Sequence, residues 1–315
     1  MPYGNGCAAE ADAPARGRVA RDRPSSRCED HRATGKHGRS PGPGGPAIAD
    51  YRGPVNGSSP FQDVDPEVLA MRASSFGSEA EAYARERPDY PDAAVLWALE
   101  PVRGREPLRV LDLAAGTGKL TAVLLRYVAD VVAVEPDPAM LAELRRLLPG
   151  ARAMAGTAEE IPLPDGSVDA VLVGQALHWF DLDRALPEIA RVLAPGGVLA
   201  GVWNLDDDEV PWVNGLKEVS KSPVSFRRWR PESILREGPL FPVIEHTRFP
   251  HSQRRTVESM VATIRTHSHV LTLSEAERTR LTDRVTAYLR STPETASGEF
   301  DLPITTATVR AIRPA

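Results

Sequence analysis

The run from Val110 to Thr121, VLDLAAGTGKLT, carries residue types that could hold a ligand. Apolar residues flank an acid, a loop of small residues with Gly116 and Gly118 follows, and a helical pattern begins at once. This order predicts a buried strand, a tight turn and a helix N-terminus, where backbone N–H groups and the helix dipole attract a ligand. Glycine suits the loop because a side chain would hold the ligand away from the backbone. Many nucleotide-binding folds use such a turn.

Glu135 stands seventeen residues after Gly118, at the end of a second apolar run. A carboxylate at the end of the second strand can accept hydrogen bonds from both hydroxyls of a ribose. The alternative is a solvated strand end, and the distance from the glycine loop favours the ribose interpretation. Together the two segments indicate a nucleoside-containing ligand.

The elements that would position these residues alternate between strand and helix. Strands are expected at 109–113, 130–134, 151–155, 168–173 and 197–203, and helices at 92–99, 119–128, 138–148 and 182–193. In the first helix, Val95, Leu96 and Leu99 are expected on one face. This alternation predicts right-handed crossovers and a mostly parallel sheet with helices on both faces.

The pattern changes after Trp203. The remaining chain is less regular, with strands expected at 243–249 and 303–312 and helices at 257–265 and 274–289. This half suits a helical lid and two sheet strands added to a ligand-binding core. An Arg/Trp cluster, Arg227–Arg230, is expected to be a solvated face, with binding of an acidic substrate as the alternative.

The first sixty residues differ in composition from the rest. They contain eighteen Pro and Gly and two aromatic residues, which predicts a disordered Pro/Gly/Arg-rich extension over 1–70. Both cysteines, Cys7 and Cys28, lie there, so no disulfide or cysteine-ligated metal is expected elsewhere. The recognisable pattern of helices and strands starts near Met71, so translation that starts at Met71 is an alternative.

Composition also limits location and partners. No apolar run reaches the ~18 residues of a membrane span, and no signal peptide is visible. Residues 61–315 carry a net charge of −8, because the first sixty residues carry +3 and the whole chain carries −5. We therefore expect a cytoplasmic protein that binds neither membrane nor nucleic acid.

Four segments together resemble the class I S-adenosylmethionine (SAM)-dependent methyltransferases. They are DLAAGTG (112–118), VVAVEPDPAML (131–141), GTAEEIPLPDGSVDAVLVGQALHWFD (156–181) and LAPGGVLA (193–200). The resemblance covers 71–315 and implies a Rossmann-like α/β fold with a seven-stranded sheet. It implies a cofactor-binding core over 71–205 and a substrate-covering region with the last strands over 206–315. QALHWFD, FGSEAEAYARERPDYP and DLPITTATVRAIR are also similar to a small-molecule branch that includes trans-aconitate-type enzymes.

The resemblance implies SAM as cofactor and assigns residues to its site. The matching positions are Asp112, Ala114, Gly116, Thr117, Gly118, Glu135, Pro136, Met140, Thr157, Ala158 and Gln175. Pro136 and Met140 would pack on the adenine, and Thr157 and Ala158 would face its edge, where the family often has an acid in place of Thr157. Asp112 would brace the loop or meet the cofactor's ammonium group.

The implied reaction is transfer of the SAM methyl group to a small-molecule acceptor, with O-methylation favoured over C- or N-methylation and a carboxylate as one candidate acceptor. His178 would serve as a base for a hydroxyl acceptor, or would only shape the pocket if the acceptor is a carboxylate. A nicotinamide dehydrogenase fits less well, since its fingerprint needs a third glycine where Thr121 stands. A SAM-binding protein without turnover stays open, and no metal is expected at His267 and His269 or elsewhere.

Overall fold

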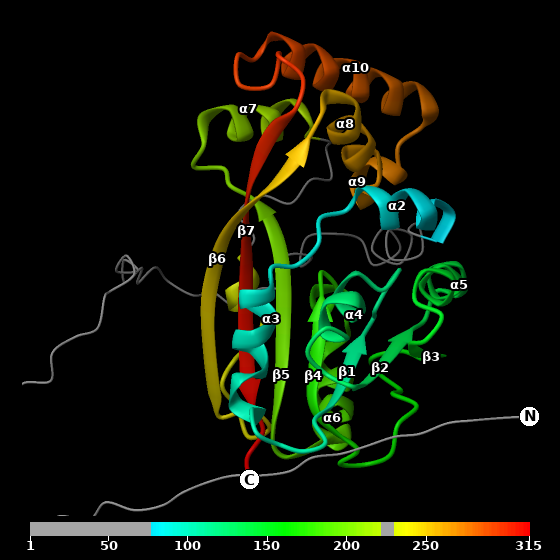
Figure 1. The fold of residues 1–315 in the computed structure, drawn as a ribbon, viewed down its shortest axis with the longest axis vertical. Coiled ribbons are helices and arrows are strands. Elements are labelled where there is room, and N and C mark those ends of the chain that lie inside the picture. Colours follow the sequence, from blue (N-terminus) through cyan, green and yellow to red (C-terminus); the bar gives the residue numbers. More distant parts are fainter. Residues whose placement is uncertain (1–76, 222–229) are drawn as a thin grey trace, which may run out of the picture. The chain divides into compact units, whose positions relative to one another are not determined.

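The computed structural model describes residues 77–221 and 230–315, and these contain one seven-stranded sheet. The strand order is β3-β2-β1-β4-β5-β7-β6 (Figure 1). The strands are β1 (Arg109–Leu113), β2 (Asp130–Glu135), β3 (Arg152–Ala155), β4 (Val168–Gly174), β5 (Leu193–Asp206), β6 (Val243–Arg255) and β7 (Phe300–Ile312). β1 to β5 are parallel, and β7 runs antiparallel to both of its neighbours. The predicted mostly parallel sheet of seven strands is confirmed.

Helices cover both faces of this sheet, because successive strand residues point to opposite sides. Val110 packs on one side with Val95 and Leu124, whereas Leu111 packs on the other with Ile189. The first side carries α3 (Asp92–Leu99), α4 (Lys119–Leu124) and α5 (Pro138–Leu147), and the second carries α6 (Leu182–Val192). Burial on both faces explains why the central strands read as continuous apolar runs.

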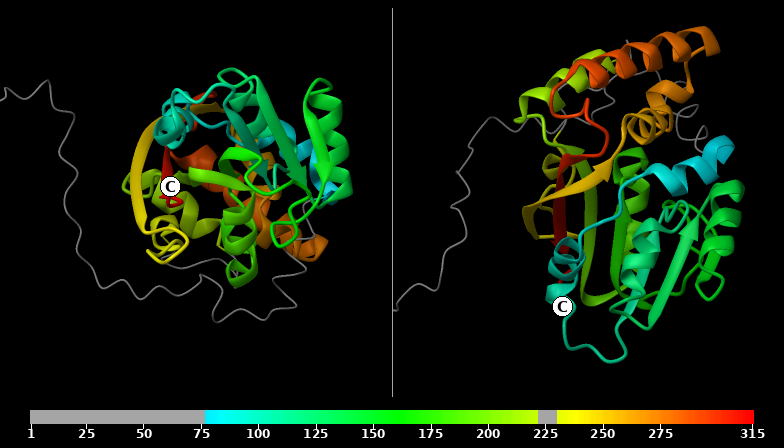
Figure 2. Two further views of the ribbon diagram at one scale, coloured as in Figure 1. Left: turned by 90° about the horizontal axis from the view of Figure 1, so that it is seen from below. Right: turned by 45° about the horizontal axis from the view of Figure 1, so that its top comes forward.

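A second group of helices lies beyond the carboxyl end of β5. It consists of α7 (Pro211–Val219), α8 (Val257–Arg265), α9 (Ser268–Leu271) and α10 (Glu275–Ser291). These helices share an apolar cluster that includes Trp212, Met260, Val285 and Phe300, and α7 lies beside α10 (Figures 1 and 2). β7 pairs with β5 only from Ile304 onward, and its first residues pair with β6 alone. This two-stranded extension carries the helical group away from the sheet.

Shorter elements complete the described chain. They are α2 (Ala80–Glu86) and the 3₁₀ turns η1 (Gly77–Glu79), η2 (Glu100–Val102), η3 (Leu177–Trp179) and η4 (Pro231–Ser233). No helix of the described residues is long and apolar enough to cross a bilayer. The predicted extension over 1–70, the alternative start at Met71 and most of the Arg227–Arg230 cluster lie outside the described residues.

Three local predictions were wrong. Leu96 is 45% exposed, and the buried face of α3 carries Ala94, Val95, Ala98 and Leu99. The helix expected over 119–128 ends at Leu124, where i→i+3 hydrogen bonds tighten the next turn toward β2. The strands expected over 197–203, 243–249 and 303–312 are longer, because β7 pairs residue by residue with β6 over thirteen positions and with β5 over nine.

Asp169 anchors the amino-terminal end of the sheet. Its carboxylate, 5% exposed, accepts hydrogen bonds from the Arg109 backbone N–H and from the guanidinium groups of Arg109 and Arg105 at 2.9–3.0 Å. Arg105 also donates to the carbonyl oxygen of Pro195 at 2.7 Å. Burial alone would raise the pKa of Asp169, but these hydrogen bonds outweigh it and lower the pKa to about 2.

We expect Asp169→Asn to lower the free energy of unfolding at pH 7 by about 2 kcal/mol, the equivalent of the pKa shift. Because the folded-state pKa lies below the ordinary value, this stabilisation is present above about pH 4 and is lost as the pH falls toward 2. Urea unfolding between pH 3 and 7 measures it. The matched control Asp301→Asn removes a carboxylate that is 59% exposed and should cost under ~0.5 kcal/mol. Equal losses in the free energy of unfolding for the two variants would contradict the role of Asp169 as an anchor of the sheet.

Candidate active site

The loop between β1 and α4 exposes its backbone at one glycine and packs at another. Gly116 has φ 57°, and an added Cβ would meet nothing within 4 Å. Gly118 has φ 88°, and a Cβ there would lie 2.9 Å from Leu148 and 3.0 Å from Leu144. Gly118 therefore lets α4 begin close to α5, whereas Gly116 leaves open space beside the chain. Ala114, with φ 56°, adopts the same strained left-handed region without being a glycine.

The Glu135 carboxylate ties this loop to the end of β2. The N–H of Gly116 donates to Oε2 at 2.8 Å, and the N–H of Asp137 donates to Oε1 at 2.9 Å. Glu135 is only 6% exposed. Burial raises the pKa of Glu135, and the two backbone hydrogen bonds partly counter this. Each carboxylate oxygen can accept a further hydrogen bond, so the group can still serve a diol.

Asp112 lies fully buried beneath the first turn of α4. Its Oδ2 accepts a hydrogen bond from the Thr121 hydroxyl at 2.5 Å, and its Oδ1 has no partner among the described residues. Burial raises the pKa of Asp112 to about 7, and the charge of Glu135 adds to the effect. The carboxyl group braces the loop and retains one unsatisfied acceptor. The hydroxyl of Thr117 is buried and unpartnered in the same loop.

The remaining predicted cofactor residues lie at the carboxyl ends of the neighbouring strands. Pro136 is exposed beside Glu135, and Met140 is 3% exposed in α5, whose N-cap is Asp137. Thr157 is exposed and its hydroxyl accepts from the Glu160 N–H at 3.1 Å, whereas Ala158 is buried. Parallel strands bring all these positions to one edge of the sheet.

Gln175 follows β4 in the left-handed region, with φ 57°. Its N–H donates to the Val202 carbonyl oxygen at 2.9 Å, and its side-chain Nε2 donates to the Asn204 carbonyl oxygen at 3.0 Å. Both bonds tie the turn after β4 to β5. Ala114 and Gln175 both have positive φ without being glycines, and each directly follows a strand at the carboxyl edge of the sheet.

His178, the predicted base, is held in one neutral tautomer. The indole N–H of Trp203 donates to its Nδ1 at 3.2 Å, which places the ring proton on Nε2. Burial lowers the pKa of His178 to about 3. The imidazole therefore has Nδ1 occupied and a proton on Nε2, an arrangement that favours a hydrogen-bond donor over a base.

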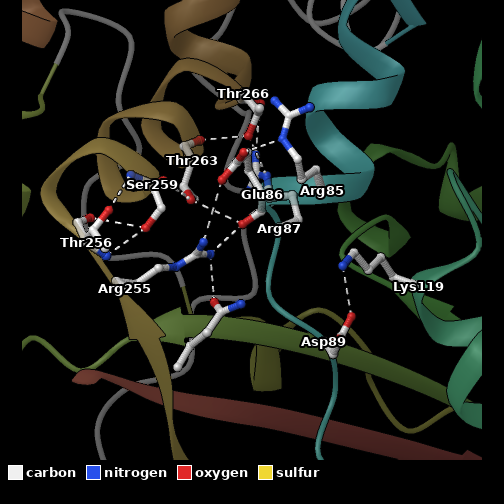
Figure 3. A network of polar contacts seen from close by, with 11 residues as sticks. Arg85, Glu86, Arg87, Asp89, Lys119, Arg255, Thr256, Ser259, Thr263 and Thr266 are labelled. Atoms are coloured by element: carbon white, nitrogen blue, oxygen red, sulfur yellow. Dashed lines mark hydrogen bonds and ion pairs between the residues drawn. The ribbon is translucent and has the colours of Figure 1, made fainter. Parts of the chain in front are cut away.

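A buried polar network that no local sequence pattern indicates joins α2 to the helical group (Figure 3). The Arg255 guanidinium donates to the Glu86 carbonyl oxygen and to the Gln253 side chain. Arg87 donates to the hydroxyl and the carbonyl oxygen of Thr266, both at 3.0 Å. The contacts link α2 to β6 and α8. The contacting residues of α2 lie more than 160 positions before those of β6 and α8, so no local sequence pattern can reveal the contacts.

His267 and His269 lie close together, with ring centroids 5.5 Å apart. Within 77–221 and 230–315, no group of three His, Cys, Asp or Glu side chains is placed to hold a metal ion.

Comparisons with known proteins find similarity to methyltransferases. A family model described as a methyltransferase domain matches residues 111–201. An uncharacterized methyltransferase of Mycobacterium tuberculosis is 45% identical over 241 residues, which cover 75% of this chain and 95% of the relative. A malonyl-[acyl-carrier protein] O-methyltransferase of Methylococcus capsulatus is 44% identical over 103 residues, covering 31% of this chain and 38% of that protein. A solved structure from Anaeromyxobacter dehalogenans, described as a candidate type II methyltransferase, has TM-score 0.55 and 28% identity, and covers 73% of this chain and 99% of that chain.

We expect Asp112→Asn to stabilise the ligand-free protein at alkaline pH. With a folded-state pKa of about 7, the wild type loses stability as the pH rises from about 4 through 7, because the carboxyl group must ionise in a buried site. Asparagine keeps an acceptor for Thr121 and carries no charge. Thermal melts should show a Tm about 2–6 °C higher for the variant at pH 8, and no gain at pH 4. A Tm equal to or below that of the wild type at pH 8 would contradict the raised pKa.

Proposed function

This chain belongs to the SAM-dependent methyltransferases, and we propose that it methylates a small molecule, with the cofactor held along the loop that joins β1 to α4. The observation that carries the proposal is the Glu135 bridge, which fixes the open backbone at Gly116 beside a carboxylate with acceptor capacity to spare. SAM supplies an electrophilic methyl group on a positively charged sulfur.

The residues present fit this cofactor. Glu135 would accept hydrogen bonds from the ribose hydroxyls, and the open space at Gly116 would admit the chain of the methionine portion. The Oδ1 of Asp112 has no partner among the described residues, and it would help to offset the positive charge of the SAM ammonium group. Around them we place Ala114, Thr117 and Gln175 at the methionine end and Pro136, Met140, Thr157 and Ala158 around the adenine.

The acceptor that we favour is a carboxylate. An ionised carboxylate oxygen can attack the methyl carbon as the carbon–sulfur bond breaks, and no proton has to be removed. The neutral, donor-type tautomer of His178 supports such a reaction. The relative from Methylococcus capsulatus is named for O-methylation of a malonyl group, and the trans-aconitate-like features of the sequence lead to the same chemistry. We propose that 71–205 bind the cofactor and that the helices within 206–315 cover the acceptor.

We expect Glu135→Ala to weaken SAM binding by roughly 1.5–3 kcal/mol, the scale of charge-assisted hydrogen bonds. Calorimetric titration measures the affinity, and a melt checks that the fold survives. The control Glu294→Ala removes an exposed carboxylate remote from the glycine loop and should leave the affinity unchanged. Unchanged SAM affinity in Glu135→Ala would remove Glu135 from the site. Binding of NADH instead of SAM by the wild type would overturn the proposed function.

We expect His178→Ala to lower kcat by less than about tenfold and to leave the pH profile unchanged, because His178 has no base function. Carboxylic acids tested with labelled SAM provide the acceptor for this assay, and His246→Ala, which alters an exposed histidine of β6, is the control. A general base typically contributes about 10²–10⁴-fold. A fall of a hundredfold or more with intact SAM binding would establish His178 as a base.

A further inference from the structure

A cavity of about 150 Å³ lies among α2, α8 and the first turn of α10. Ala82 of α2 and Ala262 of α8 line it with short side chains, which leave the space open. An apolar cavity of this size can admit a molecule as large as benzene, so a phosphate ion or a phosphoryl group fits inside. None of the lining residues belongs to the glycine loop or to the carboxyl ends of the parallel strands. The cavity is therefore separate from the proposed cofactor site.

Each of the three helices contributes an arginine to the lining of this cavity. They are Arg85 of α2, Arg265 of α8 and Arg278 of α10, and Glu79 is the one acid in the described lining. Three positive charges thus face one negative charge. A guanidinium group is a planar fork of donors that matches the oxygens of a phosphate or a carboxylate. The composition of the wall therefore suits a small oxyanion.

Acidic side chains beside the cavity neutralise two of these arginines only in part. Arg85 donates from Nε to Glu86 at 2.7 Å, and its Nη1 lies 4.0 Å from Glu81. Figure 3 shows the two terminal nitrogens of Arg85 pointing away from Glu86. Arg278 lies 3.8 Å from Glu275, whose side chain is 75% exposed, and exposed pairs of this kind contribute little. The terminal donors of both arginines can therefore serve a ligand.

Donors without acceptors remain at the wall of the cavity. Nε of Arg278 is buried and has no partner within 77–221 and 230–315, while its Nη2 donates to the carbonyl oxygen of Leu271 at 3.2 Å and holds the group in place. Arg265 forms no ion pair with any residue of the same ranges. A buried donor without an acceptor costs free energy. An anion in the cavity would supply the missing acceptor oxygens.

We propose that this cavity binds a small oxyanion, either free phosphate or the phosphoryl group of a metabolite. Arg265, Arg278 and a terminal nitrogen of Arg85 are its donors. SAM carries no phosphate group, so the ligand of this cavity is distinct from the cofactor. Thr266 also lines the cavity and accepts both hydrogen bonds from Arg87. A bound anion therefore stabilises the packing of α2 against α8 and α10.

Thermal melts and calorimetric titration of the full chain with inorganic phosphate test this proposal. Saturating phosphate should raise Tm by about 2–4 °C above its value in potassium chloride of equal ionic strength, because a ligand of the folded state stabilises it. The double variant Arg265→Gln/Arg278→Gln should lose this shift and bind phosphate at least about tenfold more weakly. The control Arg280→Gln/Arg290→Gln removes the same charge from exposed positions of α10 and should retain both.

A second variant keeps the test independent of the stability of the double variant. Ala262→Glu retains all three arginines and places a carboxylate in the cavity, so its Tm in chloride should equal or exceed that of the wild type and its phosphate shift should vanish. A wild-type response to phosphate no larger than that to chloride would overturn the inference. A response that persists in Arg265→Gln/Arg278→Gln or in Ala262→Glu would overturn it as well.

Titration with glycerol 3-phosphate distinguishes the two sources of the oxyanion. Binding that is tighter than that of phosphate, and that the arginine double variant loses, identifies a phosphate monoester as the ligand. Weaker or equal binding identifies the free ion. Failure of every phosphate response would leave the proposed methyl transfer intact, because the cavity and the proposed cofactor site share no residue.

Discussion

The carboxylate of Glu135 is the constraint on which the rest of the site depends. It accepts one N–H from the glycine loop and one from the turn after β2, and so sets the distance between the ends of two parallel strands. The second N–H belongs to Asp137, whose own side chain caps α5. α5 in turn supplies Leu144, against which Gly118 packs. One buried carboxylate thereby positions the loop and the starts of both helices that flank it.

The buried carboxyl groups near the two ends of the sheet differ in how completely they are hydrogen-bonded. At the amino end, Asp169 has its hydrogen-bonding capacity filled by two arginines and a backbone N–H. Among the described residues, Asp112 and Thr117 near the carboxyl end retain buried atoms without partners, as does Ser167 directly before β4, and Ala114 and Gln175 have positive φ. Unsatisfied groups and strain reduce stability, and proteins retain them where a ligand binds. The Asp169 carboxylate is thus fully hydrogen-bonded, whereas Asp112 keeps one oxygen without a partner among the described residues.

The sequence predicted the sheet because parallel strands buried on both faces leave an unmistakable alternation of apolar runs and helical segments. It also predicted Glu135 at the end of the second strand, but it did not predict the hydrogen bond from the Gly116 N–H to this carboxylate. The exposure of Leu96 was missed because eight residues are too few for a helical period to select one face. The contact between the Tyr90 hydroxyl and Gly174 was missed for another reason: the two residues lie eighty-four positions apart, and only the folded chain brings them together.

The protonation states around the strand ends restrict the chemistry. Burial keeps His178 and Tyr90 neutral at physiological pH, and Trp203 occupies the one nitrogen of His178 that could accept a proton. Of the two buried acids near the glycine loop, Asp112 lies beneath α4 and is bonded to Thr121, and Glu135 accepts two backbone N–H groups. The neutral states of His178 and Tyr90 among the described residues therefore support our proposal of an acceptor that arrives already ionised. For such an acceptor the alignment of nucleophile, methyl group and leaving sulfur would supply the acceleration.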